Sequence, residues 1–83
     1  MSVGQYNIID DDVIIEEGAS VGNFNVIASG TIIRKGVVVG NYCEIGKNND
    51  IGENAIVQGR IRTAANCIIE KNVTIKYGTI LTE

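Results

Sequence analysis

The stretch VVVGNYCEIGKNNDIGENAIV, residues 37–57, decides the fold, because an aliphatic residue followed by glycine occurs in it every six residues. The pairs stand at positions 39 and 40, 45 and 46, and 51 and 52. An α-helix repeats its apolar residues at a period near 3.6 and an isolated amphipathic strand at a period of 2, so neither produces a period of six. The stretch therefore indicates a coil built from short parallel strands.

The six-residue period extends over the whole chain. Steps of six from Val3 reach fourteen positions, of which thirteen are aliphatic, and Thr63 is the exception. The following residue is Gly, Ala, Asp or Glu at ten of the fourteen. Internal repetition of this kind is typical of solenoids, in which each repeat covers the apolar side of the next.

This pattern resembles the hexapeptide-repeat superfamily, in which an aliphatic residue is followed by a small or acidic residue, two variable residues and another small one. The resemblance covers Val3 to Glu83 and implies an all-β fold, a left-handed parallel β-helix with three hexapeptides in each triangular coil. Most parallel crossovers are right-handed, so the handedness comes from the resemblance alone. Fourteen hexapeptides predict between four and five coils in a single domain, residues 1–83, and whether this domain is part of a longer chain stays open.

At eighteen residues per coil the aliphatic positions stack in three columns, with neighbours expected about 4.8 Å apart. Thr63 lies in the second column and is predicted to be its weak point, because its hydroxyl would be buried without a partner. We therefore expect Thr63→Val to stabilise the fold. The columns are Val3, Val21, Val39, Val57 and Ile75; Ile9, Ile27, Ile45, Thr63 and Leu81; and Ile15, Ile33, Ile51 and Ile69.

Two of the three corners carry residues suited to tight turns with positive φ. They are Asp12, Gly30, Asn48 and Asn66 at one corner and Gly18, Gly36, Asn54 and Asn72 at the other. The third corner differs, since it carries Tyr6, Phe24, Tyr42, Arg60 and Gly78.

The three aromatic residues of that corner have two interpretations. They either stack to shield the backbone at a broader turn, or they form an exposed contact surface. The resemblance favours contact, because members of the superfamily are typically parallel trimers. We therefore predict a homotrimer with Tyr6, Phe24 and Tyr42 at the interface.

Composition excludes several function classes. A net charge of −3 argues against nonspecific nucleic-acid binding, which requires neutralisation of phosphates. No apolar run is long enough for a membrane span or a signal segment, and two cysteines are too few for a disulfide framework. We expect a cytoplasmic protein in which Cys43 and Cys67 fill the core. Asp10, Asp11 and Asp12 show no convergent ligand set, so no metal is expected.

The run IIDDDVIIEEGASVG, residues 8–22, looks like the opening coils of nucleotide-sugar and lipid-precursor acyltransferases. The resemblance implies transfer of an acetyl or other acyl group from acyl-CoA to a sugar or nucleotide-sugar acceptor. Histidine is the usual general base in such enzymes and the zinc ligand of the related γ-class carbonic anhydrases. This chain has no histidine, so the carbonic anhydrase branch is excluded and the catalytic residues stay unknown.

Glu44 is either a substitute base or, more simply, the ion-pair partner of Arg62.

Basic residues gather near the end of the sequence. Residues 59–83 carry four basic and two acidic side chains, whereas residues 1–58 carry three and eight. Arg60, Arg62 and Lys76 are the candidate ligands for the phosphates of CoA, although such a patch is also compatible with ordinary solvated surface.

Two functions therefore remain open. The first is a hexapeptide-repeat acyltransferase, truncated and inactive for want of histidine; the second is a noncatalytic trimeric β-helical scaffold or assembly module. The first and last coils lack caps within this sequence, so we also expect either further coils or end-to-end stacking to cover them.

Overall fold

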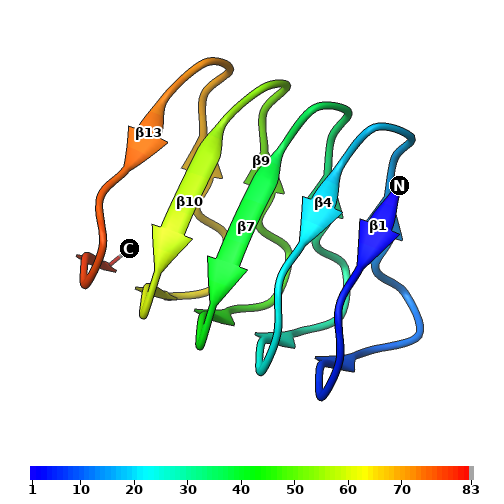
Figure 1. Cartoon of the computed structure of the whole chain (residues 1–83). Helices are drawn as coiled ribbons and strands as arrows, with labels where there is room; N and C mark the ends of the chain where they lie inside the picture. The colour runs from blue at the N-terminus through cyan, green and yellow to red at the C-terminus, as the bar shows by residue number, and fades with distance from the viewer. Residues whose placement is uncertain (83) are drawn as a thin grey trace.

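Each hexapeptide of the chain folds into one short strand and one corner. The computed structural model describes residues 1–82, and Figure 1 shows their coils stacked along one axis. The fourteen strands fall into three parallel sheets. Sheet A holds β1 (Ser2–Val3), β4 (Ser20–Val21), β7 (Val38–Asn41), β10 (Ile56–Gly59) and β13 (Thr74–Ile75); sheet B holds β2 (Ile8–Ile9), β5 (Val26–Ile27), β8 (Glu44–Ile45), β11 (Arg62–Thr63) and β14 (Ile80–Leu81); sheet C holds β3 (Ile14–Ile15), β6 (Ile32–Ile33), β9 (Asp50–Ile51) and β12 (Ile68–Ile69).

Strand pairing follows the eighteen-residue register without a slip. Val21 pairs with Val39, and Ile27 pairs with Ile45, in parallel ladders. The prediction of an all-β, left-handed parallel β-helix of between four and five coils is confirmed. Residues 1–82 contain no helix, and so none long enough to cross a membrane.

The glycine that follows so many aliphatic residues is required by the close approach of neighbouring coils. A Cβ on Gly22 would lie 2.6 Å from the carbonyl oxygen of Gly40, and one on Gly46 would lie 2.8 Å from that of Thr63. Real Cβ atoms do not come so close to backbone, so a larger residue at either position would push the coils apart.

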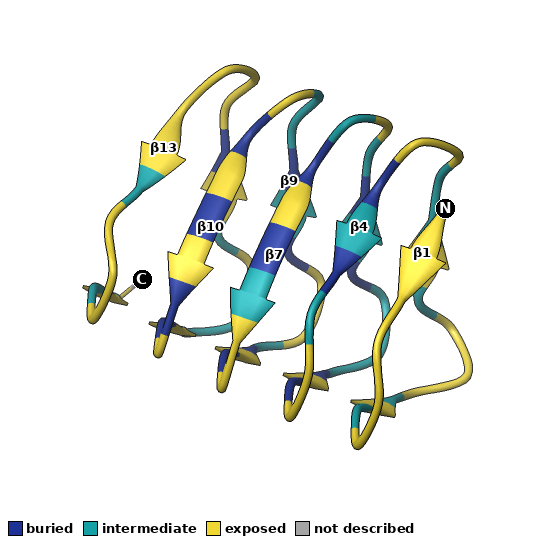
Figure 2. Cartoon of the chain, viewed as in Figure 1, coloured by how far each residue is buried: buried dark blue, intermediate teal, exposed yellow. Residues whose placement is uncertain are grey.

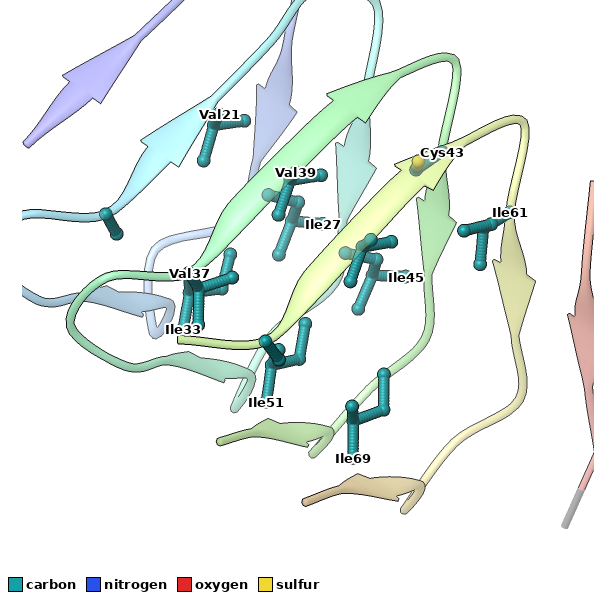
Figure 3. Close-up of a cluster of buried hydrophobic side chains, with 13 residues drawn as sticks. Val21, Ile27, Ile33, Val37, Val39, Cys43, Ile45, Ile51, Ile61 and Ile69 are labelled. Atoms are coloured by element: carbon teal, nitrogen blue, oxygen red, sulfur yellow. The ribbon is translucent and has the colours of Figure 1, made fainter. Parts of the chain in front are cut away.

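The predicted columns form the core. Ile27, Ile33 and Ile51 are completely buried, and Figure 3 shows their side chains gathered inside the coils. Burial falls toward both ends of the solenoid, as Figure 2 shows. Val3 is 41% exposed, whereas Ile75 and Leu81 are partly buried against the core.

The expectation that Thr63 lacks a partner is wrong. Its hydroxyl donates to Oδ1 of the buried Asn49 at 2.7 Å and accepts a hydrogen bond from the Gly46 N–H at 3.0 Å. Neighbouring coils make a different bond here, since the Ala28 N–H donates to a backbone carbonyl, that of Ile45. The site is therefore polar and satisfied, which reverses the expected effect of Thr63→Val.

The two turn-like corners behave as predicted with one exception. Asn48, Asn54, Asn66 and Asn72 have φ between 56° and 65°, and the glycines at positions 18, 30 and 36 also have positive φ. Asp12 is the exception, because it is not among the residues with positive φ. The remaining turns use the left-handed conformation that Asn and Gly tolerate best.

The two cysteines are free, and the prediction that they fill the core is confirmed for Cys43 but not for Cys67. Cys43 is fully buried, and burial raises the pKa of its thiol. Cys67 is only half-buried, because it lies one coil nearer the open end of the solenoid.

Candidate functional site

The third corner forms a continuous column of stacked side chains, which we call the aromatic edge: Tyr6, Phe24, Tyr42 and Arg60. The ring centroids of Tyr6 and Phe24 are 5.0 Å apart, as are those of Phe24 and Tyr42, and the ring planes of both pairs are nearly parallel. The guanidinium of Arg60 lies 4.5 Å from the centre of the Tyr42 ring. This separation is that of a cation–π contact. The column lies between sheets A and B.

The rings of the aromatic edge are exposed despite their stacking. Tyr6 is 72% exposed, Phe24 is 46% exposed and Tyr42 is 49% exposed. Stacking thus covers the faces of the rings and leaves their outer edges to solvent. The two sequence interpretations are therefore not exclusive, since the rings shield one another and still offer an apolar contact surface.

Every residue of the aromatic edge has left-handed backbone geometry. Their φ values are 62° at Tyr6 and Phe24, 61° at Tyr42 and 49° at Arg60. Bulky residues adopt this region rarely, and each instance costs of order 1–3 kcal/mol, so the surrounding structure must hold them there.

Two ladders of side-chain amides hold this corner. On the outer side, Asn23 Oδ1 accepts the Gln5 N–H at 2.8 Å and Asn41 Oδ1 accepts the Asn23 N–H at 2.7 Å. On the inner side, the buried Asn25 donates from Nδ2 to the Gly40 carbonyl at 2.9 Å. Its Oδ1 accepts the Cys43 N–H at 2.8 Å.

Sequence reasoning did not find these ladders, although a signal is present. Each aromatic residue of the edge is preceded by Asn or Gln, and Tyr6 and Phe24 are followed by Asn, with an eighteen-residue spacing. Asparagine near a corner, considered alone, predicts only a tight turn. Its recurrence every eighteen residues on both sides of an aromatic residue indicates ladders of side-chain amide hydrogen bonds along the corner.

Two shallow hollows flank Arg60. One, of about 370 Å³, is lined by Asn41, Tyr42, Gln58, Gly59, Arg60 and Tyr77. The other, of about 300 Å³, is lined by Tyr42, Glu44, Arg60, Ile61, Arg62, Gly78 and Ile80. The structure thus brings Arg60 and Arg62 to one hollow. Lys76, the third basic residue of the predicted patch, lines neither.

Glu44 forms the expected ion pair with Arg62 across adjacent coils. Oε1 of Glu44 and Nη2 of Arg62 are 3.0 Å apart, and both side chains are more than half exposed. An exposed pair of this kind contributes little to stability. Glu44 is therefore held near Arg62 on sheet B, beside the hollow that also contains Arg60.

Asp50 lies on a different face from Glu44, on sheet C. Its two carboxylate oxygens accept hydrogen bonds from Arg34 Nε and Nη2, each at 3.0 Å, and Glu16 lies 3.9 Å from the same guanidinium. This contact lowers the pKa of Asp50 and raises the pKa of Arg34. Arg34 and Asp50 border an open hollow of about 560 Å³ on that face.

Metal-ligating side chains do not converge in the part of the chain that the structure describes. Asp10, Asp11 and Asp12 line a hollow of about 380 Å³ with Ile9 and Ser29. Within residues 1–82 no three His, Cys, Asp or Glu side chains are grouped so that they could hold a metal ion.

No protein-family model matches the chain, and no curated protein sequence does. Among solved structures, the crystal structure of native serine acetyltransferase 1 from Entamoeba histolytica is similar, with a TM-score of 0.79 and 25% sequence identity. The match covers 95% of this chain and 35% of that enzyme. The solenoid therefore has the hexapeptide-repeat fold found in acyltransferases, and it corresponds to about a third of the length of that relative.

Proposed function

We propose that the chain is the β-helical part of a hexapeptide-repeat acyltransferase, which transfers an acetyl or other acyl group from CoA to a sugar or nucleotide-sugar acceptor. The observation that carries the proposal is the similarity of nearly the whole solenoid to a serine acetyltransferase. That similarity supports the acyl-transfer chemistry; the sugar or nucleotide-sugar acceptor rests on the resemblance of residues 8–22 to the opening coils of sugar-modifying acyltransferases.

In this proposal the aromatic edge and the adjacent basic residues receive acyl-CoA. Arg60 and Arg62 share one hollow, and neither is buried, so both guanidinium groups can reach a phosphate. Arginine binds phosphate through a planar fork of N–H donors, which gives both charge and orientation. Lys76 would supply a third positive charge outside the hollow.

The chain contributes binding and orientation to this chemistry, because it has no imidazole that could act as a general base. Holding an acceptor amine or hydroxyl against the thioester carbonyl can supply a large part of the rate by itself. Glu44 lines the hollow that contains Arg60 and Arg62, but it is engaged in an ion pair with Arg62, which gives it a structural role.

The proposed assembly is a parallel homotrimer in which Tyr6, Phe24 and Tyr42 contact the neighbouring subunit. Their outer edges are exposed, and their positions are fixed by stacking and by the amide ladders. Rigid, exposed aromatic residues are enriched at protein interfaces. Replacing all three with serine is expected to convert trimers to monomers in sedimentation velocity; an intact trimer would remove the aromatic edge from the interface.

A noncatalytic trimeric scaffold is the second candidate. The absence of histidine favours it, as does the engagement of Arg60 with Tyr42 and of Arg62 with Glu44. Because these guanidinium groups already make contacts within the chain, they have fewer free N–H donors with which to bind the phosphates of a cofactor. The scaffold needs only the aromatic edge and the strand ladders, both of which the structure contains.

Thermal unfolding with and without CoA and acetyl-CoA separates the two candidates. A ligand at a hundred times its dissociation constant stabilises the folded state by about 2.7 kcal/mol, which raises the melting temperature measurably. Arg60→Gln and Arg62→Gln should each reduce this shift, while Lys47→Gln, an exposed cation away from the groove, should not. No shift with either ligand, in a chain that still forms trimers, would favour the scaffold.

A further inference from the structure

The column of the aromatic edge has an open position directly after Arg60. The next residue of this column is Gly78, which lies one coil beyond Arg60 and has no side chain. Within residues 1–82, a Cβ on Gly78 would have no heavy atom within 4 Å apart from its chain neighbours. Each earlier step of the column brings one flat group over another, with 5.0 Å between ring centroids. The space that a fifth flat side chain would fill is therefore open.

Arg60 presents one side of a flat cation to this open position. Its guanidinium lies over the Tyr42 ring, so the opposite side of the group faces the level of Gly78. In the part of the chain that the structure describes, Arg60 belongs to none of the ion pairs. A guanidinium stacks on aromatic rings through its flat face. The open position can therefore accept a ring stacked on Arg60.

Apolar side chains border the position on two sides. The Tyr77 ring lies against Gly59, where a Cβ would be 3.2 Å from Tyr77 Cδ2, and it lines the first hollow beside Arg60. Ile80 lines the second hollow together with Gly78, and both Tyr77 and Ile80 are about two-thirds exposed. Ligand pockets usually measure roughly 300–1,000 Å³. The second hollow, of about 300 Å³, thus has room for one ring system.

Arg62 adds an anion-binding group to the same hollow. Its Nη2 donates one hydrogen bond to Glu44 Oε1 at 3.0 Å. A guanidinium carries five N–H donors, so this bond leaves others that can reach a phosphate. The hollow therefore combines a flat surface for a ring with a fork of donors for an anion.

We propose that the base of a nucleotide binds beside Gly78, stacked on the Arg60 guanidinium as the next flat group of the column, while Arg62 binds the phosphate. Bases stack on arginine and on aromatic side chains whatever their hydrogen-bonding pattern. The position therefore selects a nucleotide without selecting one base. An aromatic side chain of another subunit would fill the ring position but would leave Arg62 without an anion.

This inference rests on the proposed function for its natural ligand, because acyl-CoA is itself a nucleotide derivative. It assigns different parts of that ligand to the two arginines, the base to Arg60 and a phosphate to Arg62. The base occupies a different coil from Tyr6, Phe24 and Tyr42, which are the residues assigned to subunit contact.

Titrations followed by NMR with adenosine, adenosine monophosphate and ribose phosphate separate the two parts of the ligand. Adenosine should bind by itself and shift the amide signals of Arg60 and Gly78. Arg60→Lys keeps the charge but has no flat face, so it should weaken adenosine binding about tenfold and leave ribose phosphate unchanged. Arg62→Gln should weaken the monophosphate and leave adenosine unchanged. Absence of adenosine binding, or equal adenosine affinity in the wild type and Arg60→Lys, would overturn the proposal.

Filling the open position with a side chain tests the site independently. Gly78→Phe should place a ring against Arg60 and abolish adenosine binding, because Tyr6 and Phe24 already adopt positive φ at this corner. Gly78→Ala is the matched control, since it imposes the same backbone constraint without a ring and should bind adenosine as the wild type does. Circular dichroism checks that both variants keep their strands. Equal adenosine affinity in the two variants would contradict the stacking.

Thermal unfolding with acetyl-CoA distinguishes failure of this inference from failure of the proposed function. A stabilising shift with acetyl-CoA in a chain that does not bind adenosine would leave the proposed function in place and overturn the stacked base. Adenosine binding that responds to Arg60→Lys and Gly78→Phe, without any shift from acetyl-CoA, would support the stacked base and contradict the acyl-CoA ligand.

Discussion

Replacing Thr63 with valine should destabilise the fold, although Thr63 interrupts an otherwise aliphatic column. The Thr63 hydroxyl donates to Asn49 Oδ1 at 2.7 Å, and Asn49 is 1% exposed. The two N–H groups of Asn49 Nδ2 are shared among three hydrogen bonds, to the carbonyls of Gly46, Lys47 and Ala64, which fix the orientation of the amide. The oxygen cannot turn to find another donor without breaking them.

The magnitude follows from two opposing effects. A buried acceptor left without its donor costs about 1–3 kcal/mol. The methyl group that replaces the hydroxyl gains about 0.8 kcal/mol of apolar burial. The Gly46 N–H also loses its acceptor, but the Thr63 carbonyl can replace it, because the equivalent bond in the neighbouring coil runs from the Ala28 N–H to the Ile45 carbonyl. The difference is a net loss of about 0.2–2.2 kcal/mol, with a middle value near 1.2 kcal/mol.

Urea unfolding followed by circular dichroism measures this loss as a lower midpoint at constant slope. Thr74→Val is the matched control, because Thr74 is exposed on β13 and its substitution should change stability by less than about 0.5 kcal/mol. Thr63→Ser keeps the hydroxyl and loses one buried methyl group, so it should lower the free energy of unfolding by about 0.8 kcal/mol. The reasoning predicts the order wild type, Ser, Val from most to least stable; a valine variant as stable as the wild type would refute it.

Three further predictions concern other buried or paired groups. Asn25→Leu should destabilise the fold by about 2–4 kcal/mol, because it leaves the Cys43 N–H and the Gly40 carbonyl without partners. Asn23→Ala removes only the exposed acceptor of the Gln5 N–H and should destabilise it by about 1 kcal/mol or less in the same urea titration. Asp50 has a pKa below its ordinary value, so its ion pair with Arg34 stabilises the fold above about pH 4 and this contribution disappears as pH falls through the lowered pKa. Because the pair is partly exposed, its contribution should be under about 1 kcal/mol. The urea midpoint of the wild type should therefore fall slightly between pH 6 and pH 3, and in Asp50→Asn the part of this fall that the pair causes should be absent. In a Cys67→Ser background, a thiol reagent should modify Cys43 only after urea unfolding, because Cys43 is buried and its pKa is raised; rapid labelling of the native chain would contradict the burial.

The fold could be predicted from the sequence because each coil repeats one rule. The aliphatic position, the small residue after it and the corner residue recur at fixed spacing, so a period count is enough to place Val39, Ile45 and Ile51 in the core. The corner carrying Tyr6, Phe24 and Tyr42 was located in the same way. Which column a residue belongs to depends only on its position in the sequence, so it can be found by counting residues.

Contacts between different columns could not be predicted in that way. Thr63 and Asn49 are fourteen residues apart, and Arg34 and Asp50 are sixteen apart, so neither pair shares a column. Whether two such residues come into contact depends on the directions of their side chains in adjacent coils, which the spacing of residues in the sequence does not give. The expectation for Thr63 was wrong because a column considered alone does not show that Asn49 reaches it from another column.

The amide ladders explain how bulky residues remain at a corner that elsewhere uses glycine or asparagine. Positive φ has a conformational cost at each aromatic residue. The side chains of Asn23 and Asn41 accept backbone N–H groups beside it and that of Asn25 donates to a backbone carbonyl, and these bonds hold the backbone in place. The stacking distance of 5.0 Å between rings is close to the strand spacing of about 4.8 Å, so the rings stack without disturbing the coils. A ligand or a second subunit that binds this edge thus meets side chains that are already ordered, and little entropy is lost on binding. Loosening the ladder at Asn25 should therefore weaken association at the aromatic edge as well as stability.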